Sequence, residues 1–426
     1  MRTDLLITNG EVLDPGGGHS GRLDVAVSGG RILAVAPDLP REEARDVVDA
    51  TGLLVLPGLV DAHTHVFPGA TYWGIDPDGL AWSSGVTTWI DAGTAGAFGI
   101  DALRATVGRY GVRVRSLLNI ASVGLAGRTG ESLNLENCDV ELARKTVSAN
   151  RDLVVGIKVR MDRHTVGDNG LEPLRRAREV ADECALPIMM HIGHGPPAVF
   201  RLVDLLRPGD IVTHCASGVT EGMVTARRVH PAIIEAHRRG VVFDIGHGFG
   251  GFSFDVVETQ LAAGLRPHLI STDLHARSLY GPVFDLPTTM NKLLAVGMDL
   301  AAVVAATTSR PAEILGLPDG VGTLAPGAPA DIALFSVQEG AFTLSDAAGN
   351  RRTGTRRLVN AATFVAGHPL PPRLPAPPPP WISLTDAQRA ALKTRERALR
   401  ELLTTPLVGP DGLDHGRAGE PGTERC

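Results

Sequence analysis

The stretch Gly58-Leu-Val-Asp-Ala-His-Thr-His65 decides how the chain is interpreted, because an apolar run ends there in two histidines separated by one residue. Alternate side chains share a face of an extended strand, so Asp61, His63 and His65 are expected to point the same way. Imidazole nitrogen is a common ligand for zinc and similar ions. The motif therefore indicates a metal site, although two ordinary strand-end histidines would give the same short pattern.

Composition excludes several classes of protein. Charged residues make up 21% of the chain, the net charge is −6 and no basic run stands out. Neither nucleic acid nor an anionic membrane surface is therefore expected as a partner. No apolar stretch reaches the roughly 20 residues of a membrane-spanning helix. We expect a soluble, cytoplasmic protein that acts on a small molecule.

Outward from the motif, strand-like apolar runs alternate with helix-like segments, which predicts parallel strands joined by crossover helices. Eight such runs fit an α/β fold of the (β/α)8 TIM-barrel type. A doubly wound open sheet is the competing architecture, but no Gly-x-Gly-x-x-Gly follows the first run. The runs cover residues 59–65, 86–92, 112–121, 153–160, 187–192, 210–214, 241–246 and 269–273.

The two ends of the chain have a different character. Residues 1–56 and 321–366 read as short strands separated by Gly-rich turns, and a few isolated strands are marginally stable. We therefore expect both ends to build one small β-sandwich, with the barrel (57–320) inserted between them. A Pro-rich linker (367–382), a helix (383–403) and a disordered tail (404–426) are predicted to follow. The helix could dock on the enzyme or on a second subunit, which leaves a homo-oligomer open.

The ends of the predicted strands carry polar side chains in a regular order. In a (β/α)8 barrel the active site lies where the strands end, at their C-terminal face. Each residue alone has an ordinary structural explanation, but six candidate ligands at one rim favour a shared site. These candidates are His63, His65, Lys158, His191, His214 and Asp273.

As an ordered set, these motifs resemble those of the amidohydrolase superfamily. The first-strand motif, Ile157-Lys158-Val159, Met190-His191, Thr213-His214 and Ser271-Thr-Asp273 each match one of its strand signatures. Gly322-Thr-Leu-Ala-Pro-Gly-Ala-Pro-Ala-Asp-Ile-Ala is similar to its return from barrel to sandwich. Other segments, including Ala70-Thr-Tyr-Trp-Gly-Ile-Asp-Pro-Asp and Phe243-Asp-Ile-Gly-His-Gly, resemble the amidohydrolase/deacetylase metallohydrolase subgroup, which is dihydroorotase-like.

The resemblance implies two divalent metal ions, with Zn²⁺ the expected metal. A lysine ammonium has no lone pair, so Lys158 can be a ligand only if it is chemically changed. In the family this lysine is carboxylated by carbon dioxide, and its carbamate bridges the two ions. His63, His65 and Asp273 would complete the first site, and His191 with His214 the second. Asp273 would be the catalytic residue, taking a proton from the activated water and passing it to the leaving nitrogen.

Substrate-binding candidates follow two of the strands. Arg160 lies two residues after Lys158, where its guanidinium could bind a substrate carboxylate or pair with a barrel acid. His247 could hydrogen-bond a substrate carbonyl or carboxylate, and Gly250 and Gly251 would let backbone N–H groups approach it. A simple flexible loop is an equal explanation for the glycine-rich stretch.

These observations predict a binuclear hydrolase of carbon–nitrogen bonds that deacetylates or deacylates small N-acyl or O-acyl carboxylic acids. The alternatives are a cyclic amidase of the dihydroorotase or hydantoinase kind, a phosphotriesterase-like hydrolase, and a non-catalytic metal-binding barrel. Dihydroorotases carry an arginine two residues after the second histidine, whereas Val66 and Phe67 follow His65 here. That departure weakens the dihydroorotase interpretation.

Overall fold

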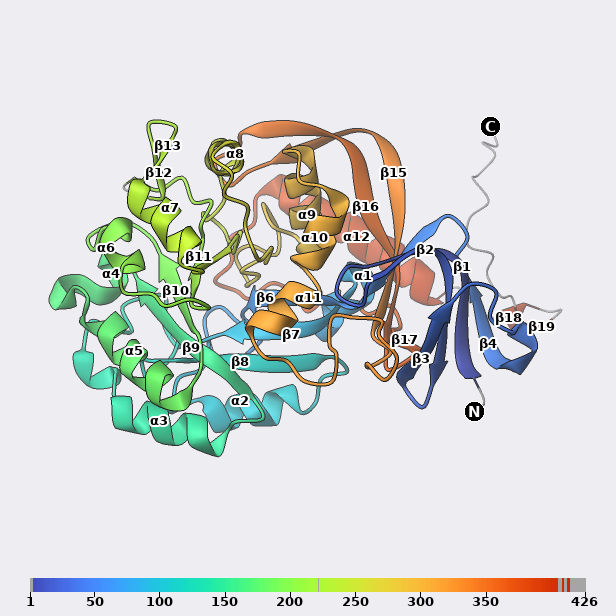
Figure 1. Cartoon of the computed structure of the whole chain (residues 1–426), viewed down its shortest axis with the longest axis horizontal. Helices are drawn as coiled ribbons and strands as arrows, with labels where there is room; N and C mark the ends of the chain where they lie inside the picture. Colours follow the sequence, from blue (N-terminus) through green and yellow to red (C-terminus); the bar gives the residue numbers. More distant parts are fainter. Residues whose placement is uncertain (1–2, 221, 405–407, 410–411, 414–426) are drawn as a thin grey trace.

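A curled parallel sheet forms the centre of the computed structural model, which describes residues 3–220, 222–404, 408–409 and 412–413 (Figure 1). Seven strands pair in chain order, each parallel to the next, and the arrangement is TIM-barrel-like as predicted. The strands are β6 (Leu59–Thr64), β7 (Val86–Ala92), β8 (Arg113–Asn119), β9 (Val154–Met161), β10 (Ile188–Ile192), β11 (Ile211–Thr213) and β14 (Val242–Asp244).

The eighth predicted strand, 269–273, is not a regular strand. The segment makes only isolated parallel bridges, Asp244 with Leu269 on one side and Thr64 with Leu274 on the other. The Asp61 carboxylate accepts hydrogen bonds from the Thr272 N–H at 3.0 Å and the Thr272 hydroxyl at 2.6 Å, where a strand partner would otherwise bind. The segment nevertheless connects β14 to β6 and brings the two edges of the sheet together.

Apolar side chains from the seven strands and from the segment 269–273 fill the interior of this sheet. They form one buried cluster, to which α11 (Ser309–Ile314) and the following loop also contribute side chains. This layered packing is typical of a TIM barrel. The cluster comprises Val60, Ala62, Ile90, Ala92, Leu117, Val155, Met189, Ile211, Val242, Leu269, Ala312, Leu315 and Val321.

Helices cover the outside of the sheet, as expected for crossover connections. In α5 (Glu172–Cys184), Leu174, Ala177, Val180, Ala181 and Cys184 are buried at spacings of three and four, so one face packs on the barrel. The other helices before the C-terminal tail are α1 (Asp78–Ser84), α2 (Ile100–Val107), α3 (Val140–Ala149), α4 (Arg163–Val166), α6 (Val199–Val203), α7 (Pro231–Arg238), α8 (Phe254–Ala262), α9 (Leu286–Ala295), α10 (Leu300–Ala305) and α11 (Ser309–Ile314).

The two ends of the chain share a second sheet of eight strands, seen beside the barrel in Figure 1. Its centre is the antiparallel pair β5 and β15, which joins residues 53–57 to residues 332–336. The expected pairing of the chain ends is therefore present, while the two-layer packing of a sandwich stays a prediction, as do the domain boundaries. The strands are β1 (Thr3–Asp14), β2 (His19–Ser28), β3 (Arg31–Ala36), β4 (Ala44–Asp49), β5 (Leu53–Pro57), β15 (Ile332–Ser345), β16 (Arg351–Val365) and β17 (His368–Pro369).

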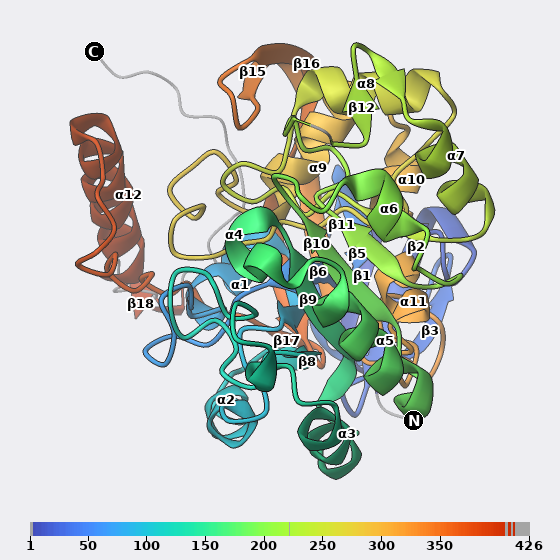
Figure 2. The same ribbon diagram turned by 90° about the vertical axis from the view of Figure 1, so that its left-hand side faces the viewer.

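The C-terminal segment runs back along the molecule to α12 (Asp386–Thr404), which Figure 2 shows at its edge. The helix begins at a reciprocal capping box: the Gln388 N–H donates to the Thr385 hydroxyl, and the Thr385 N–H donates to Gln388 Oε1. Most of the predicted tail 404–426 lies outside the described residues. Among those described, no helix combines the length and apolar character needed to cross a bilayer.

Candidate active site

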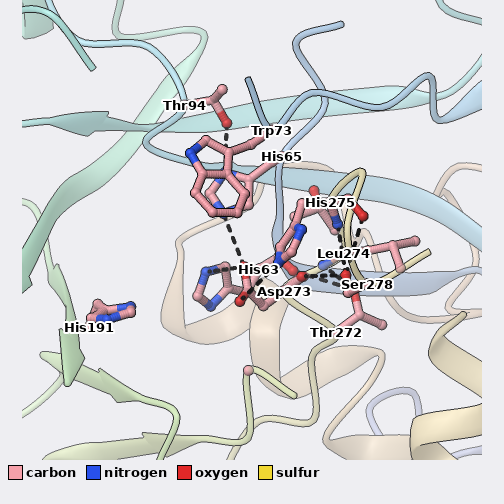
Figure 3. Close-up of polar contacts among 12 residues, drawn as sticks. His63, His65, Trp73, Thr94, His191, Thr272, Asp273, Leu274, His275 and Ser278 are labelled. Atoms are coloured by element: carbon pink, nitrogen blue, oxygen red, sulfur yellow. Dashed lines mark hydrogen bonds and ion pairs between the residues drawn. The ribbon is translucent and has the colours of Figure 1, made fainter. Parts of the chain in front are cut away.

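All six predicted ligands line one pocket where the barrel strands end. Figure 3 shows four of them: His63, His65, His191 and Asp273. His63 Nε2 lies 3.1 Å from Lys158 Nζ and 3.3 Å from Asp273 Oδ1. His65 Nε2 lies 3.0 Å from Asp273 Oδ1, and His214 Nε2 lies 2.8 Å from His191 Nδ1. Side chains from β6, β9, β10, the end of β11 and the segment after β14 thus meet in one place.

Hydrogen bonds on the far side of the rings orient three of the histidines. His214 Nδ1 lies 2.6 Å from the Gly246 carbonyl, which can only accept, so Nδ1 carries the proton. Thr213 donates its hydroxyl proton to Asp244, which leaves its oxygen to accept from His63 Nδ1 at 2.9 Å. His65 Nδ1 lies 2.8 Å from the Thr94 hydroxyl. These contacts turn the Nε2 atoms toward the centre, as partners of metal-bound histidines commonly do.

Burial sets the protonation of the cluster. It lowers the pKa of His214 to about 4, and burial together with the charge of Lys158 lowers the pKa of His63 well below its ordinary value. Burial alone would raise the pKa of Asp273, but the surrounding imidazoles outweigh it and hold that pKa well below its usual range. Burial also lowers the pKa of Lys158 to about 7. Near neutral pH the cluster therefore offers neutral imidazoles and an ionised carboxylate.

This donor set fits divalent metal ions. Ligand atoms of His63, His214 and Asp273 all lie within 4.8 Å of one another. Neutral imidazole and carboxylate are the protonation states that metal binding requires. Lys158 is buried beside them with a pKa low enough to hold a neutral amine, the form that can react with carbon dioxide.

A pocket of about 270 Å³ opens above the cluster. Arg160 lines it, and its guanidinium is also paired within the protein. Its Nε lies 3.4 Å from the buried Glu131 carboxylate, and Nη2 lies 3.3 Å from the Thr165 hydroxyl. A second arginine, Arg277, lines the rim with its guanidinium 4.5 Å from the Phe249 ring centroid. Two cationic groups thus border a mostly apolar opening.

The remaining substrate-binding candidates lie in the glycine-rich loop after β14, and only the two glycines line the pocket. Gly250 and Gly251 line the pocket, whereas His247 is fully buried beneath the loop. His247 Nδ1 donates to the Gly248 carbonyl at 2.9 Å, and Nε2 lies 2.8 Å from the Nζ atom of Lys292. Burial lowers the pKa of His247 to about 3 and that of Lys292 to about 7. The structure therefore places His247 as a support of the loop and not among the lining residues.

Sequence reasoning passed over several residues that hold the cluster in place. The Asp61 carboxylate accepts hydrogen bonds from Thr272, a contact with the eighth segment that the first-strand motif alone does not indicate. Asp244 binds Thr213 and Ser271, and Lys292 reaches His247 from α9. The acidic residue inside the apolar run Val241 to Gly246 was the available signal for Asp244. Nothing near Lys292 in the sequence distinguishes it from a surface lysine.

Comparison with known proteins places the chain in a family. The model of the amidohydrolase family matches residues 54–205 and 253–367. A deacetylase from Enterococcus faecalis is 35% identical over 371 residues, covering 86% of this chain and 99% of that protein. A deacetylase from Agrobacterium fabrum is 33% identical over 356 residues, covering 82% of this chain and 87% of that protein.

Two solved structures are also similar over most of the chain. One is described as an adenine deaminase (TM-score 0.81, 34% identity, covering 86% of this chain and 99% of the other). The second is described as a dihydroorotase (TM-score 0.79, 31% identity, covering 88% and 99%). From the family match and these relatives, the chain belongs to the amidohydrolase family and is a hydrolase that acts on carbon–nitrogen bonds.

Proposed function

We propose that the protein is a metal-dependent deacylase that releases the acyl group from small N-acyl or O-acyl compounds carrying a carboxylate. The observation that carries the proposal is the convergence of Lys158, four histidines and Asp273 beneath a pocket bordered by arginines. The similarity to proteins named deacetylase, which extends over most of their length, supports the linear amide as the substrate.

The six side chains divide between two divalent ions in this proposal, with zinc the expected metal. His63, His65 and Asp273 would hold one ion, and His191 with His214 the other. Lys158 would bridge them as a carbamate: its neutral amine bonds to the carbon of carbon dioxide and loses one proton, which leaves two carboxylate oxygens. When bound, the ions lower the pKa of water and polarise the scissile carbonyl.

Asp273 carries out the proton transfers. Its low pKa keeps it ionised, so it can accept a proton from the attacking water. The same oxygen then returns that proton to the leaving nitrogen as the carbon–nitrogen bond breaks. His275 Nε2 lies 4.0 Å from Asp273 Oδ2, which places a second polar group beside this transfer.

Arg160 and Arg277 would bind the substrate carboxylate. Glu131 and Asp162 offset part of the charge of Arg160, at 3.4 and 3.8 Å, while Arg277 has an aromatic ring as its neighbour. Gly250 and Gly251 line the pocket. The Gly251 N–H donates to the His247 carbonyl at 3.0 Å, so a backbone contact with the acyl side of the substrate would come from Gly250. His247 would act by holding this loop.

A substrate panel tests the proposal. It contains N-acetyl amino acids of both hands, acetylated hydroxy acids, hydantoins, dihydroorotate and phosphotriesters, with acetate release measured directly. We expect turnover of N-acetyl acids and of their ester analogues, because activated water attacks either carbonyl. Turnover of only the cyclic amides would favour the second candidate, a cyclic amidase, which the similarity to a structure described as a dihydroorotase supports.

A further inference from the structure

The segment beyond residue 367, where the family match ends, is attached to α1 and to the two loops that carry the pocket residues Trp73 and Arg277. Arg373 Nη1 lies 2.8 Å from the half-buried carboxylate of Asp78. Further on, the Gln388 side chain donates to the Tyr280 carbonyl at 3.0 Å. The segment is therefore fixed to the barrel on both sides of Trp381.

Trp381 makes the central contact. Its indole N–H donates to the Tyr72 carbonyl at 3.2 Å, and its ring stacks on the Tyr72 ring with centroids 5.7 Å apart and planes 25° apart. Tyr72 in turn meets Trp73 edge to face, at 5.2 Å. Trp381 thus contacts both the backbone and the ring of Tyr72, the residue before Trp73.

Trp73 belongs to the pocket. It lines the opening, and its ring lies edge to face with His275, with 4.9 Å between the ring centroids. Figure 3 draws both residues together with Asp273. Its indole N–H donates to the Gly127 carbonyl at 3.1 Å. A continuous series of ring contacts therefore runs from Trp381 through Tyr72, Trp73 and His275 to the candidate ligand His65.

The packing between residues 375–381 and the loop that carries Trp73 is incomplete. A cavity of about 160 Å³ lies there, lined on the loop side by residues such as Thr71 and Ile75, and on the tail side by Pro377 and Trp381. Because a void contributes no contacts, the loop depends on the few contacts that span it. Removing the Trp381 ring would enlarge this cavity and remove both contacts with Tyr72, leaving residues 68–76 covered, among the described residues of this segment, only by Pro375 to Pro379.

We propose that the C-terminal segment is part of the specificity apparatus, with Trp381 a positioning residue that fixes Trp73 at the mouth of the pocket. The substrate part of this inference rests on the proposed deacylase function. The effect should appear in how well a bulky acyl substrate is bound, since Trp381 touches neither Asp273 nor any candidate ligand.

Two measurements on the full chain test this. Hydrogen exchange of peptides covering residues 68–76, without substrate, should be faster in Trp381→Ala than in the unaltered protein. The KM for an N-acyl amino acid should rise about 5- to 10-fold while kcat changes less than about 2-fold, the size expected for one aromatic contact. Trp381→Phe keeps the stacked ring and should restore most of both values. Lys393→Ala, exposed on α12, is the matched control and should change neither.

Unchanged exchange in residues 68–76 of Trp381→Ala would overturn the inference, as would faster exchange with an unchanged KM. Equal loss in Trp381→Phe and Trp381→Ala would assign the role to the indole N–H and overturn the stacking argument. If no panel substrate were cleaved, the proposed function would fail, and the exchange measurement would still decide whether the tail supports the loop.

Discussion

Two buried lysines show how position decides the role of a residue type. Lys158 and Lys292 are both about 1% exposed, and burial lowers the pKa of each to about 7. Lys158 lies among the candidate metal ligands, with Nζ 3.1 Å from His63 Nε2. Lys292 lies behind the glycine-rich loop, where Nζ also donates to the Pro282 carbonyl at 2.7 Å.

We predict that Lys158→Ala loses its bound metal and at least about 100-fold in kcat, because the proposed bridge links both ions. Metal analysis of the purified protein should fall from about two ions per chain to less than one. Lys292→Met is the matched control for loss of a buried lysine and should keep its metal. Two tightly held ions in Lys158→Ala would show that the lysine is not a ligand.

The pH dependence of stability should reveal Lys292. Its pKa is about 7 in the folded chain and near 10.5 when unfolded, so below pH 7 both states are protonated and the full cost of burying the charge applies. Between pH 7 and 10 only the unfolded state stays protonated, so the free energy of unfolding rises relative to Lys292→Met. The slope of this difference is at most about 1.4 kcal/mol per pH unit. Urea titrations of both proteins from pH 6 to 10 measure it, and a flat difference would contradict the shifted pKa.

The candidate ligands could be found from sequence because each follows an apolar run, and parallel strands end at one rim. The contacts that orient and support these ligands could not be found from the sequence. Thr213 and His63 are 150 residues apart and Lys292 and His247 are 45 apart, so only the folded chain brings each pair together. His247 is an example: its position after a strand suggested a substrate contact, and the sequence does not indicate that Lys292 of α9 lies 2.8 Å from its Nε2 or that the ring is buried beneath the loop.

At the scale of elements, the loop after β14 has room for a side chain at one of its two pocket glycines and not at the other. A Cβ at Gly251 would lie 2.7 Å from His214 Nδ1 and 2.9 Å from the Gly246 carbonyl oxygen. A Cβ at Gly250 would meet nothing within 4 Å. Both glycines line the pocket, so they form a matched pair.

We predict that Gly251→Ala lowers kcat/KM by about 100-fold, because the added methyl group pushes against the His214 ring, whose displacement by about 1 Å is costly for catalysis. Gly250→Ala should stay within about 2-fold of the unaltered protein, since it adds only an unhindered methyl group. Steady-state kinetics on an N-acetyl amino acid measure both. Equal effects of the two substitutions would contradict the assignment of the loop to the ligand surroundings.

Regular strands were predictable and the irregular one was not. The first seven predicted runs overlap β6 to β11 and β14, and no boundary differs by more than two residues. Residues 269–273 have the same apolar character, but Asp273 adopts a left-handed φ of 48° and Asp61 replaces the missing backbone partner of Thr272. Side-chain hydrogen bonds of this kind compete with strand pairing and leave no periodic pattern in the sequence.

At the scale of the whole molecule, the candidate metal site joins parts that the strand ladder connects only weakly. The eighth segment is held to its neighbours by isolated bridges, yet it carries Asp273, which lies within 3.3 Å of both first-strand histidines. These side chains form a metal site only in the folded chain. The free energy of metal binding would therefore add to the free energy of unfolding.

We predict that removing the metal with a strong chelator lowers the melting temperature by about 10 °C. Free metal at about 1,000 times its Kd contributes about 4 kcal/mol, and each kcal/mol is worth about 2–4 °C in a chain with large domains. Calorimetry of the metal-free protein, and again after Zn²⁺ is added back, measures the change. Hydrogen exchange should rise in residues 269–274 and stay constant in β1 and β2, which lie in the other sheet and serve as the internal control. An unchanged melting temperature in protein shown to be metal-free would mean that the barrel closes without the ions, and that its six converging side chains are stable as a hydrogen-bonded cluster alone.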